Sequence, residues 1–226
     1  MLVQDLKVGL IGGTGDEGRG LALRFAIAGA QVTIGSRSLE RARETADELN
    51  RLLEARAREP IRHAENRDAI AGSEIVLLTV PFKHAASTLE THYADFRPGS
   101  ILVDITVPVS FEQGRARYIE LPEGSASEHL QAPLPENVAL VAAFKTEPAH
   151  LLAEIDEPLD CDSFVASDSK EAKARVMDAI GFIEGLRPVD AGALESARVL
   201  ERMTLLAIGI NRRYKIKTAR YRVMGL

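Results

Sequence analysis

Apolar strand patterns and helical patterns alternate along most of this 226-residue chain. The runs IVLL at 75–78 and LVAA at 140–143 are apolar at every position, which is typical of parallel strands buried on both faces. Segments with helical spacing separate such runs, so we expect an α/β fold in which helices cover a doubly wound, mostly parallel sheet. The expected strands lie near residues 7–11, 31–34, 74–79, 101–105, 139–144 and 164–166.

Two regions between the strands give more specific expectations. Residues 39–59 are rich in Ala, Leu, Glu and Arg and predict one long helix, with Ser38 as its N-cap and Pro60 as its end. Residues 111–135 show no sustained period, and they predict a long loop of the kind that is often functional in a compact domain.

The last third of the chain predicts a different arrangement. Residues 169–186 have a helical pattern, 187–192 form a strand bounded by turns, and 194–211 form a second helix that is apolar on most sides. Such a helix requires burial on most sides. We expect it to pack either against a second subunit or within its own chain.

A glycine-rich turn between the first strand and the next helical pattern has the spacing Gly13-x-Gly15-x-x-Gly18. In this strand–turn–helix setting the spacing predicts a dinucleotide site of the Rossmann type. We assign the tight turn to Gly13, close approach of the backbone to a pyrophosphate to Gly15, and close helix–strand packing to Gly18. The N-terminus of the following helix directs free N–H groups and the positive end of its dipole toward the same anion.

The end of the second strand indicates which dinucleotide is bound. An NAD site would place Asp or Glu there to bind the ribose 2′-OH, but the chain has Ser36 and Arg37, with Arg41 one helical turn later. A hydroxyl and two guanidinium groups suit a 2′-phosphate, and we therefore expect NADP. The alternative is that the two arginines only form the solvated start of a helix, where their charge opposes the helix dipole.

Two consecutive strands end in the same Thr-Val-Pro sequence. Thr79, Val80 and Pro81 follow one strand, and Thr106-Val107-Pro108 follows the next. Ligands of open α/β sheets bind outside the carboxyl ends of the strands, so these turns are expected to line the cofactor cleft together with His84. Alternatively, each proline only ends the pairing of its strand.

Composition and charge exclude several classes of protein. The formal net charge of −5 argues against non-specific nucleic-acid binding. A single cysteine, Cys161, excludes an intramolecular disulfide framework and fits a reducing cytoplasm. We expect no signal peptide and no membrane span, because there is no basic leader with a cleavage site and no apolar run approaches 18 residues.

The C-terminal tail reverses the charge of the rest of the chain. After Glu201 every charged residue is basic. This reversal favours an anionic small molecule as a ligand, then a contact between subunits, and only distantly nucleic acid.

Groups for acid–base or metal chemistry are missing from the sequence patterns. None of the five histidines has a recognisable catalytic spacing, Tyr-x-x-x-Lys is absent, and no cluster of metal ligands is evident. Direct hydride exchange between two redox cofactors needs stacking and orientation more than a protein proton donor. We therefore expect no catalytic side chain and a second redox cofactor as the partner of NADP.

These motifs together resemble the family of coenzyme F420-dependent NADP reductases over nearly the whole chain. The matching segments are Gly12-Gly13-Thr14-Gly15 with Gly18-x-Gly20, Gly35-Ser36-Arg37, Leu78-Thr79-Val80-Pro81, Val107-Pro108-Val109-Ser110, Gly185-Leu186-Arg187-Pro188, Asp190-Ala191-Gly192, Arg213-Tyr214-Lys215 and the final Gly225-Leu226. The resemblance implies reversible hydride transfer between NADPH and the deazaflavin F420. It also implies an NADP-binding Rossmann domain at 1–147, a small, mainly helical C-terminal domain at 148–226, and a homodimer.

The resemblance also implies roles for individual residues. The pyrophosphate would be held by Thr14, Gly15, Asp16 and Glu17, and the 2′-phosphate by Ser36, Arg37 and Arg41. The nicotinamide end would be lined by Val80, Val107 and Ala149, and the deazaflavin would lie against Phe144, Lys145 and Thr146. The anionic tail of F420 would account for the basic C-terminal segment.

The chain departs from the family at Lys145, where a histidine is common. A lysine can donate to a ring carbonyl, but as a point charge rather than a flat ring. Two alternatives therefore remain: an NADPH-dependent reductase of a flavin (FMN or FAD) or another small acceptor, and a protein that binds or senses NADP without turnover.

Overall fold

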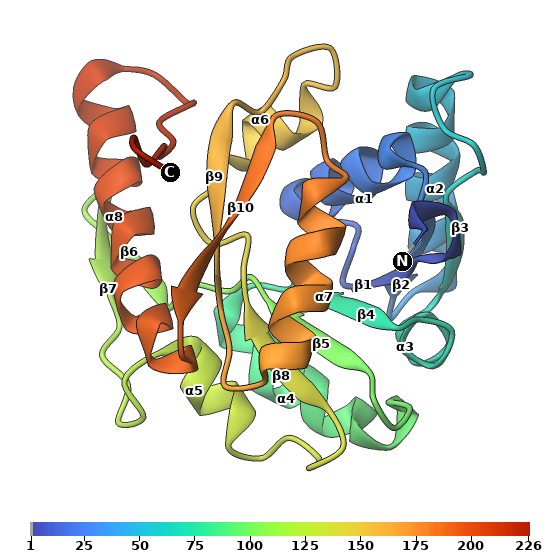
Figure 1. Ribbon diagram of the computed structural model, residues 1–226, viewed down its shortest axis with the longest axis horizontal. Coiled ribbons are helices and arrows are strands. Elements are labelled where there is room, and N and C mark those ends of the chain that lie inside the picture. Colours follow the sequence, from blue (N-terminus) through green and yellow to red (C-terminus); the bar gives the residue numbers. More distant parts are fainter. Residues whose placement is uncertain (1) are drawn as a thin grey trace.

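Eight strands form one sheet through the middle of the protein (Figure 1), which the computed structural model describes for residues 2–226. In chain order they are β1 (Lys7–Ile11), β2 (Gln31–Ser36), β3 (Arg62–Glu65), β4 (Ile75–Leu78), β5 (Ile101–Asp104), β8 (Ala139–Ala142), β9 (Cys161–Ala166) and β10 (Leu186–Gly192). The spatial order is β10-β9-β8-β5-β4-β1-β2-β3. The run from β3 to β8 has the order 3-2-1-4-5-6 of a Rossmann sheet, and all its pairings are parallel. The predicted fold class is confirmed.

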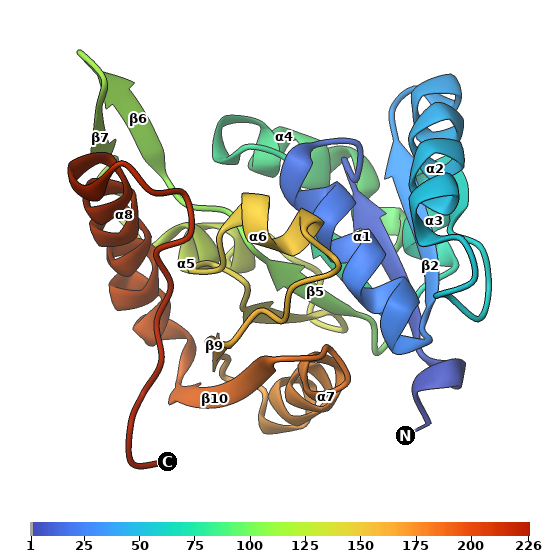
Figure 2. The ribbon, with the colours of Figure 1, turned by 90° about the horizontal axis from the view of Figure 1, so that it is seen from above.

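Helices cover both faces of this sheet (Figures 1 and 2). They are α1 (Asp16–Ala28), α2 (Leu39–Leu53), α3 (Asn66–Ala71), α4 (Phe82–His92), α5 (Ala126–Gln131), α6 (Ala149–Ala153), α7 (Lys170–Gly181) and α8 (Ala197–Tyr214), with short 3₁₀ turns at Val3–Asp5, Tyr93–Asp95 and Leu194–Ser196. Buried residues of α1, α2, α6 and α7 form one apolar cluster, and those of α3, α4, α5 and α8 form the other. Successive residues of β1 alternate between the clusters, as Leu10 and Ile11 do, because strand side chains point to opposite faces.

The C-terminal part contributes strands as well as helices. β9 meets β8 in antiparallel orientation, and β10 pairs with β9 in parallel, so both extend the same sheet. The expected helices near 169–186 and 194–211 are confirmed as α7 and α8. Figure 2 shows α8 beside the hairpin β6 (Val109–Glu112) and β7 (Arg115–Tyr118), at one side of the sheet. The domain division at residue 147 stays a prediction.

The long helix predicted at 39–59 is too long. Its N-cap is confirmed, because Ser38 Oγ accepts a hydrogen bond from the Arg41 N–H at 3.4 Å. The helix ends at Leu53, however, and Glu54 adopts a positive φ of 49°. The chain then forms β3, an edge strand whose residues are mostly exposed. β3 therefore contains no apolar run from which it could have been predicted.

The loop predicted at 111–135 is also wrong. This region contains most of the β6–β7 hairpin and the helix α5. Gln113 and Gly114 connect the two strands with φ values of 48° and 72°, and two positive φ angles are the property of a tight hairpin turn. Ser125 caps α5 by accepting from the Glu128 N–H at 3.1 Å.

A buried arginine fixes the segment after β8 to the first helix. Arg24 of α1 is 5% exposed, and its guanidinium donates to the carbonyls of Leu151, Leu152, Glu154 and Glu157. These charge-assisted hydrogen bonds go to carbonyls at the end of α6 and in the segment that follows it. This contact holds α6, and with it Ala149, against α1.

Within residues 2–226 no helix combines the length and the apolar character needed to cross a membrane.

Candidate dinucleotide-binding site

A cleft of about 420 Å³ opens at the carboxyl ends of β1, β2 and β4. This is the edge at which open α/β sheets bind ligands, between strands whose connections leave in opposite directions. The predicted residues that line it are Thr14, Gly15, Ser36, Arg37, Arg41, Thr79, Val80, Pro81 and His84. The remaining lining residues were not predicted, and they are Gly12, Asn66, Ser87, Thr88, Thr91 and His92. No acidic residue of the described part of the chain lines this cleft, which favours an anionic ligand.

The glycine turn differs in one detail from its predicted form. Gly12, not Gly13, has the positive φ, at 71°, and a Cβ there would collide with the side chain of Val80. Gly12 is therefore the position whose backbone angle favours glycine, while Gly13 lies within the same turn and its assignment to the turn stays a prediction. Gly13 is needed for packing, because a Cβ would lie 2.9 Å from that of Leu10.

The other two glycines have the geometry predicted for them. A Cβ on Gly15 would have no atom within 4 Å, so the backbone at the start of α1 faces open space that a phosphate can enter. On Gly18 a Cβ would lie 2.7 Å from Gly13 Cα and 2.9 Å from Thr79 Oγ1, so α1 packs directly on the turn.

We expect Gly18→Ala to destabilise the protein by about 1–3 kcal/mol, because the added methyl meets backbone that cannot move freely. Gly209→Ala, in the interior of α8, is the matched control. A Cβ at Gly209 would have no atom within 4 Å, so this variant should gain about 0.5–1 kcal/mol from helix propensity. Urea unfolding of both variants measures the difference. Equal stability of the two variants would contradict close packing at Gly18.

Two free guanidinium groups lie at the β2 side of the cleft. Arg37 and Arg41 are exposed, line the cleft, and have no acidic partner within residues 2–226. Ser36 Oγ lies beside them and accepts from the Ser38 N–H at 3.2 Å, which leaves its own proton available for a ligand. These donors suit a phosphate.

Two polar side chains that line the cleft also maintain its shape. The Thr79 hydroxyl donates to the Ile11 carbonyl at 2.8 Å, and the Gly12 N–H donates to Asn66 Oδ1 at 3.3 Å. Asn66 begins α3 directly after the unpredicted strand β3, so no motif marked it in the sequence. Both contacts tie the glycine turn to neighbouring elements.

Lys145 forms the centre of a buried ionic network outside this cleft. Its side chain is 1% exposed, and Nζ lies 2.8 Å from Asp104 Oδ2, 2.6 Å from the Thr106 carbonyl and 3.2 Å from Glu201 Oε1. Each of its three protons thus has an acceptor. Burial alone would lower the pKa of Lys145, but the charges of Asp104 and Glu201 outweigh this effect and raise it.

Further hydrogen bonds complete the network. Glu201 Oε2 accepts from the Tyr118 hydroxyl at 2.7 Å and from the Ala126 N–H at 3.1 Å, while Ser127 Oγ donates to Asp104 Oδ2 at 2.6 Å. Burial and the bond to Glu201 raise the pKa of Tyr118. The network therefore connects β5, the segment after β8, the start of α5, the hairpin and α8.

The residues predicted to contact a second cofactor are all buried. Phe144, Lys145 and Thr146 are 1%, 4% and 6% exposed, and the Phe144 ring packs edge-on against Phe25 with centroids 5.9 Å apart. Their assignment to the second cofactor stays a prediction. Gly13, Asp16, Glu17, Gly18, Val107 and Ala149 do not line the cleft described above.

Two carboxyl groups have raised pKa values. Burial, and then the charge of Glu147, raise the pKa of Glu17 to about 8, with a smaller lowering by Lys145 and a smaller raising by Asp104. Burial also raises the pKa of Glu147, against smaller opposing effects of Ser163 and of backbone N–H groups. Glu17 is half-buried in the first turn of α1, and Glu147 precedes α6.

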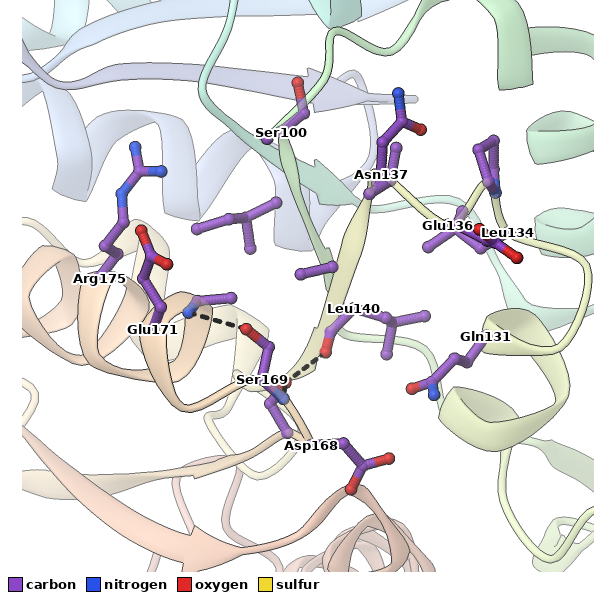
Figure 3. A pocket seen from close by; sticks show the side chains of 17 residues that line it. Ser100, Gln131, Leu134, Glu136, Asn137, Leu140, Asp168, Ser169, Glu171 and Arg175 are labelled. Carbon is purple, nitrogen blue, oxygen red and sulfur yellow. Dashed lines mark hydrogen bonds between the residues drawn. The ribbon is translucent and has the colours of Figure 1, made fainter.

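A second cleft, of about 520 Å³, opens at the opposite edge of the sheet, where β5 and β8 begin (Figure 3). Gln131, Asn137, Asp168 and Arg175 are among its polar lining residues. Ser169, which also lines it, caps α7 by accepting from the Ala172 N–H at 3.2 Å. None of the predicted site residues lines this second cleft.

Comparison with known proteins gives a consistent result. A family model described as "NADP oxidoreductase coenzyme F420-dependent" matches residues 7–108. The F420-dependent NADP reductase of Methanothermobacter thermautotrophicus is 41% identical over 229 residues, covering 99% of this chain and 97% of that protein. The enzyme of the same name from Methanocaldococcus jannaschii is 37% identical over 224 residues, covering 98% and 99%.

A solved structure supports the fold. A candidate F420-dependent NADP reductase from Arthrobacter sp. FB24 has a TM-score of 0.81 at 22% identity, covering 96% of this chain and 99% of that one. At that identity the likeness concerns the fold alone.

Proposed function

Because the chain belongs to the family of coenzyme F420-dependent NADP oxidoreductases, we propose that it transfers a hydride reversibly between NADP(H) and coenzyme F420. One structural observation carries the NADP half of this proposal. Arg37 and Arg41 are free cations beside the Ser36 hydroxyl, in a cleft without acidic lining residues. That chemistry selects a 2′-phosphate over a 2′-OH.

The residues present fit the dinucleotide. The backbone of Gly15 borders open space, in which a Cβ at this position would obstruct a bound phosphate. The N-terminus of α1 faces the same space. Thr14, Gly15 and the first turn of α1, including Asp16 and Glu17, would hold the pyrophosphate. Ser36, Arg37 and Arg41 would hold the 2′-phosphate. Thr79, Val80, Pro81 and His84 would line the inner wall of the cleft, and Val107 and Ala149 would flank the nicotinamide.

Bound NADPH and F420 would supply the hydride donor and acceptor, and the protein would bind, align and shield them. Orientation of this kind contributes much of the rate of a two-cofactor reaction and requires no catalytic side chain. The segment Phe144–Thr146 would support the deazaflavin side through its backbone and its packing, because its side chains are buried.

We further propose that the protein is a cytoplasmic homodimer. Val199 and Leu206 of α8 are 62% and 56% exposed, and Phe111 of the neighbouring hairpin is 67% exposed. Apolar side chains of this size on adjacent elements favour a contact with a second subunit. The buried free thiol of Cys161 is compatible with a reducing compartment.

The activity assay uses purified protein, NADPH and F420, with the deazaflavin absorbance as the signal. We expect the absorbance to fall only when both cofactors are present. Turnover with FMN or FAD but not with F420 would assign the protein as a flavin reductase. Tight NADP binding without turnover of any acceptor would instead indicate an NADP sensor.

A further inference from the structure

One face of the helix α4 lines the dinucleotide cleft along most of its length. Its five lining residues have the spacing i, i+3, i+4, i+7 and i+8 of a single helical face, and they are His84, Ser87, Thr88, Thr91 and His92. We call these five residues the α4 stripe. All of them are polar, and none is acidic. The α4 stripe therefore extends the cleft from the end of β4 toward the far end of α4, and it presents hydrogen-bonding groups to a ligand.

Two hydroxyl groups of the α4 stripe use their protons within the helix. Ser87 Oγ donates to the His84 carbonyl at 3.2 Å, and Thr91 Oγ1 donates to the Ser87 carbonyl at 3.0 Å. A hydroxyl group has one proton and two lone pairs, so each of these oxygens keeps a lone pair for a ligand. A ligand group that binds to Ser87 and Thr91 in this arrangement must therefore be a hydrogen-bond donor.

His92 adds a third acceptor to the α4 stripe. Its Nδ1 lies 2.8 Å from Oδ2 of Asp95, a residue that does not itself line the cleft. A carboxylate beside Nδ1 keeps the ring proton on that nitrogen, so Nε2 of the neutral imidazole carries the lone pair. The α4 stripe is therefore rich in acceptors, whereas the guanidinium groups of Arg37 and Arg41 in the same cleft can only donate.

The covalent structure of NADP indicates which of its groups meets these acceptors. The adenine base and the 2′-phosphate are attached to the same ribose, so a phosphate bound by Arg37 and Arg41 places the base in the same cleft of about 420 Å³. Adenine carries an exocyclic amino group, which donates hydrogen bonds. The carboxamide of the nicotinamide also has an amino group, but the pyrophosphate and a second ribose separate it from this part of the molecule.

We infer that Ser87, Thr91 and His92 of the α4 stripe bind the exocyclic amino group of adenine and so make the protein selective for the base of the dinucleotide. The inference rests on the proposed function, because it requires that NADP occupies this cleft. A base with a carbonyl oxygen in place of the amino group would set an acceptor against acceptors. Ser87 and Thr91 could donate to that oxygen only by giving up their hydrogen bonds to the helix carbonyls.

Two ligands that differ at this amino group test the inference without turnover. NADP⁺ and its deamino analogue, nicotinamide hypoxanthine dinucleotide phosphate, carry the same 2′-phosphate, pyrophosphate and nicotinamide. Isothermal titration calorimetry of the whole protein with each ligand gives the two dissociation constants. We expect NADP⁺ to bind about 3-fold to 30-fold more tightly than the deamino analogue, which corresponds to one or two hydrogen bonds between neutral groups.

Variants of the α4 stripe assign this preference to its side chains. The double variant Ser87→Ala, Thr91→Val removes two acceptors, and His92→Phe removes the third. Each should lower the preference for NADP⁺ over its deamino analogue, and the triple variant should abolish it. The preference for NADP⁺ over NAD⁺ should remain in all of them, because the 2′-phosphate is bound by other residues. Glu90→Ala, at an exposed position of α4 outside the cleft, is the control and should retain both preferences.

Equal binding of NADP⁺ and its deamino analogue by the unaltered protein would overturn the inference while leaving the proposed function intact. This comparison decides the question even if a variant fails to fold. A preference for NADP⁺ over its deamino analogue that persists in the triple variant would also overturn the inference, because other groups would then recognise the base. Failure of both ligands to bind would instead overturn the proposed function, and the inference with it.

Discussion

Replacing Lys145 with methionine is expected to lower the free energy of unfolding by about 3–5 kcal/mol, the cost of leaving buried charges without their partner. Asp104 and Glu201 are both fully buried, and Nζ of Lys145 lies within 3.2 Å of each. Methionine is unbranched and fills most of the space of the lysine side chain, so the loss would come mainly from charge rather than from a cavity. Urea unfolding monitored by circular dichroism measures it.

A second ion pair, with the same nitrogen–oxygen distance as Lys145 and Asp104, provides the control. Arg62 and Glu59 are also 2.8 Å apart, but their side chains are 57% and 38% exposed. Arg62→Met should therefore cost at most about 1 kcal/mol. The triple variant Lys145→Met, Asp104→Asn, Glu201→Gln removes all three charges and should recover part of the stability lost in Lys145→Met. A loss below about 1 kcal/mol in Lys145→Met would contradict the role given to the network.

The sequence identified Lys145 as unusual but could not show what it contacts. Its partners Asp104 and Glu201 are far away in the chain, and no periodicity relates them to it. Residues that meet only through the packing of β5, the β8–α6 segment and α8 leave no local pattern. The glycine turn and Ser36-Arg37 were predictable, in contrast, because the motif and the site coincide over a few residues.

The same distinction applies to the fold. Buried parallel strands such as β4 and β5 have uninterrupted apolar runs, and their positions were predicted closely. The strands β3, β6 and β7 are edge or hairpin strands with exposed, polar residues, and they were missed. The Gln113-Gly114 turn was the available signal for the hairpin, because a glycine at a two-residue connection permits the positive φ that such a turn requires.

Arg37→Ala is expected to raise the KM for NADPH about 10-fold to 100-fold, which corresponds to the roughly 1.5–3 kcal/mol of a hydrogen bond to a charged group. The KM for NADH, which lacks the 2′-phosphate, should change little. Dissociation constants of the dinucleotides report the same difference when turnover with NADH is too slow to measure. Added salt should narrow the preference for NADPH in the unaltered protein, because Arg37 is exposed and its charge is screened.

Arg51→Ala is the matched control for this prediction. Arg51 lies near the other end of the same helix and does not line the cleft, so its loss should leave both constants unchanged. Arg41→Ala should repeat the effect of Arg37→Ala, and the double variant should discriminate least between the two dinucleotides. If Arg37→Ala weakened the binding of NADPH and of NADH equally, the arginine would contact a part of the molecule that both dinucleotides share. The 2′-phosphate would then have to be bound by other residues. The double variant is not expected to prefer NADH, because the cleft has no acidic lining residue. In an NAD site such a residue accepts a hydrogen bond from the ribose 2′-OH.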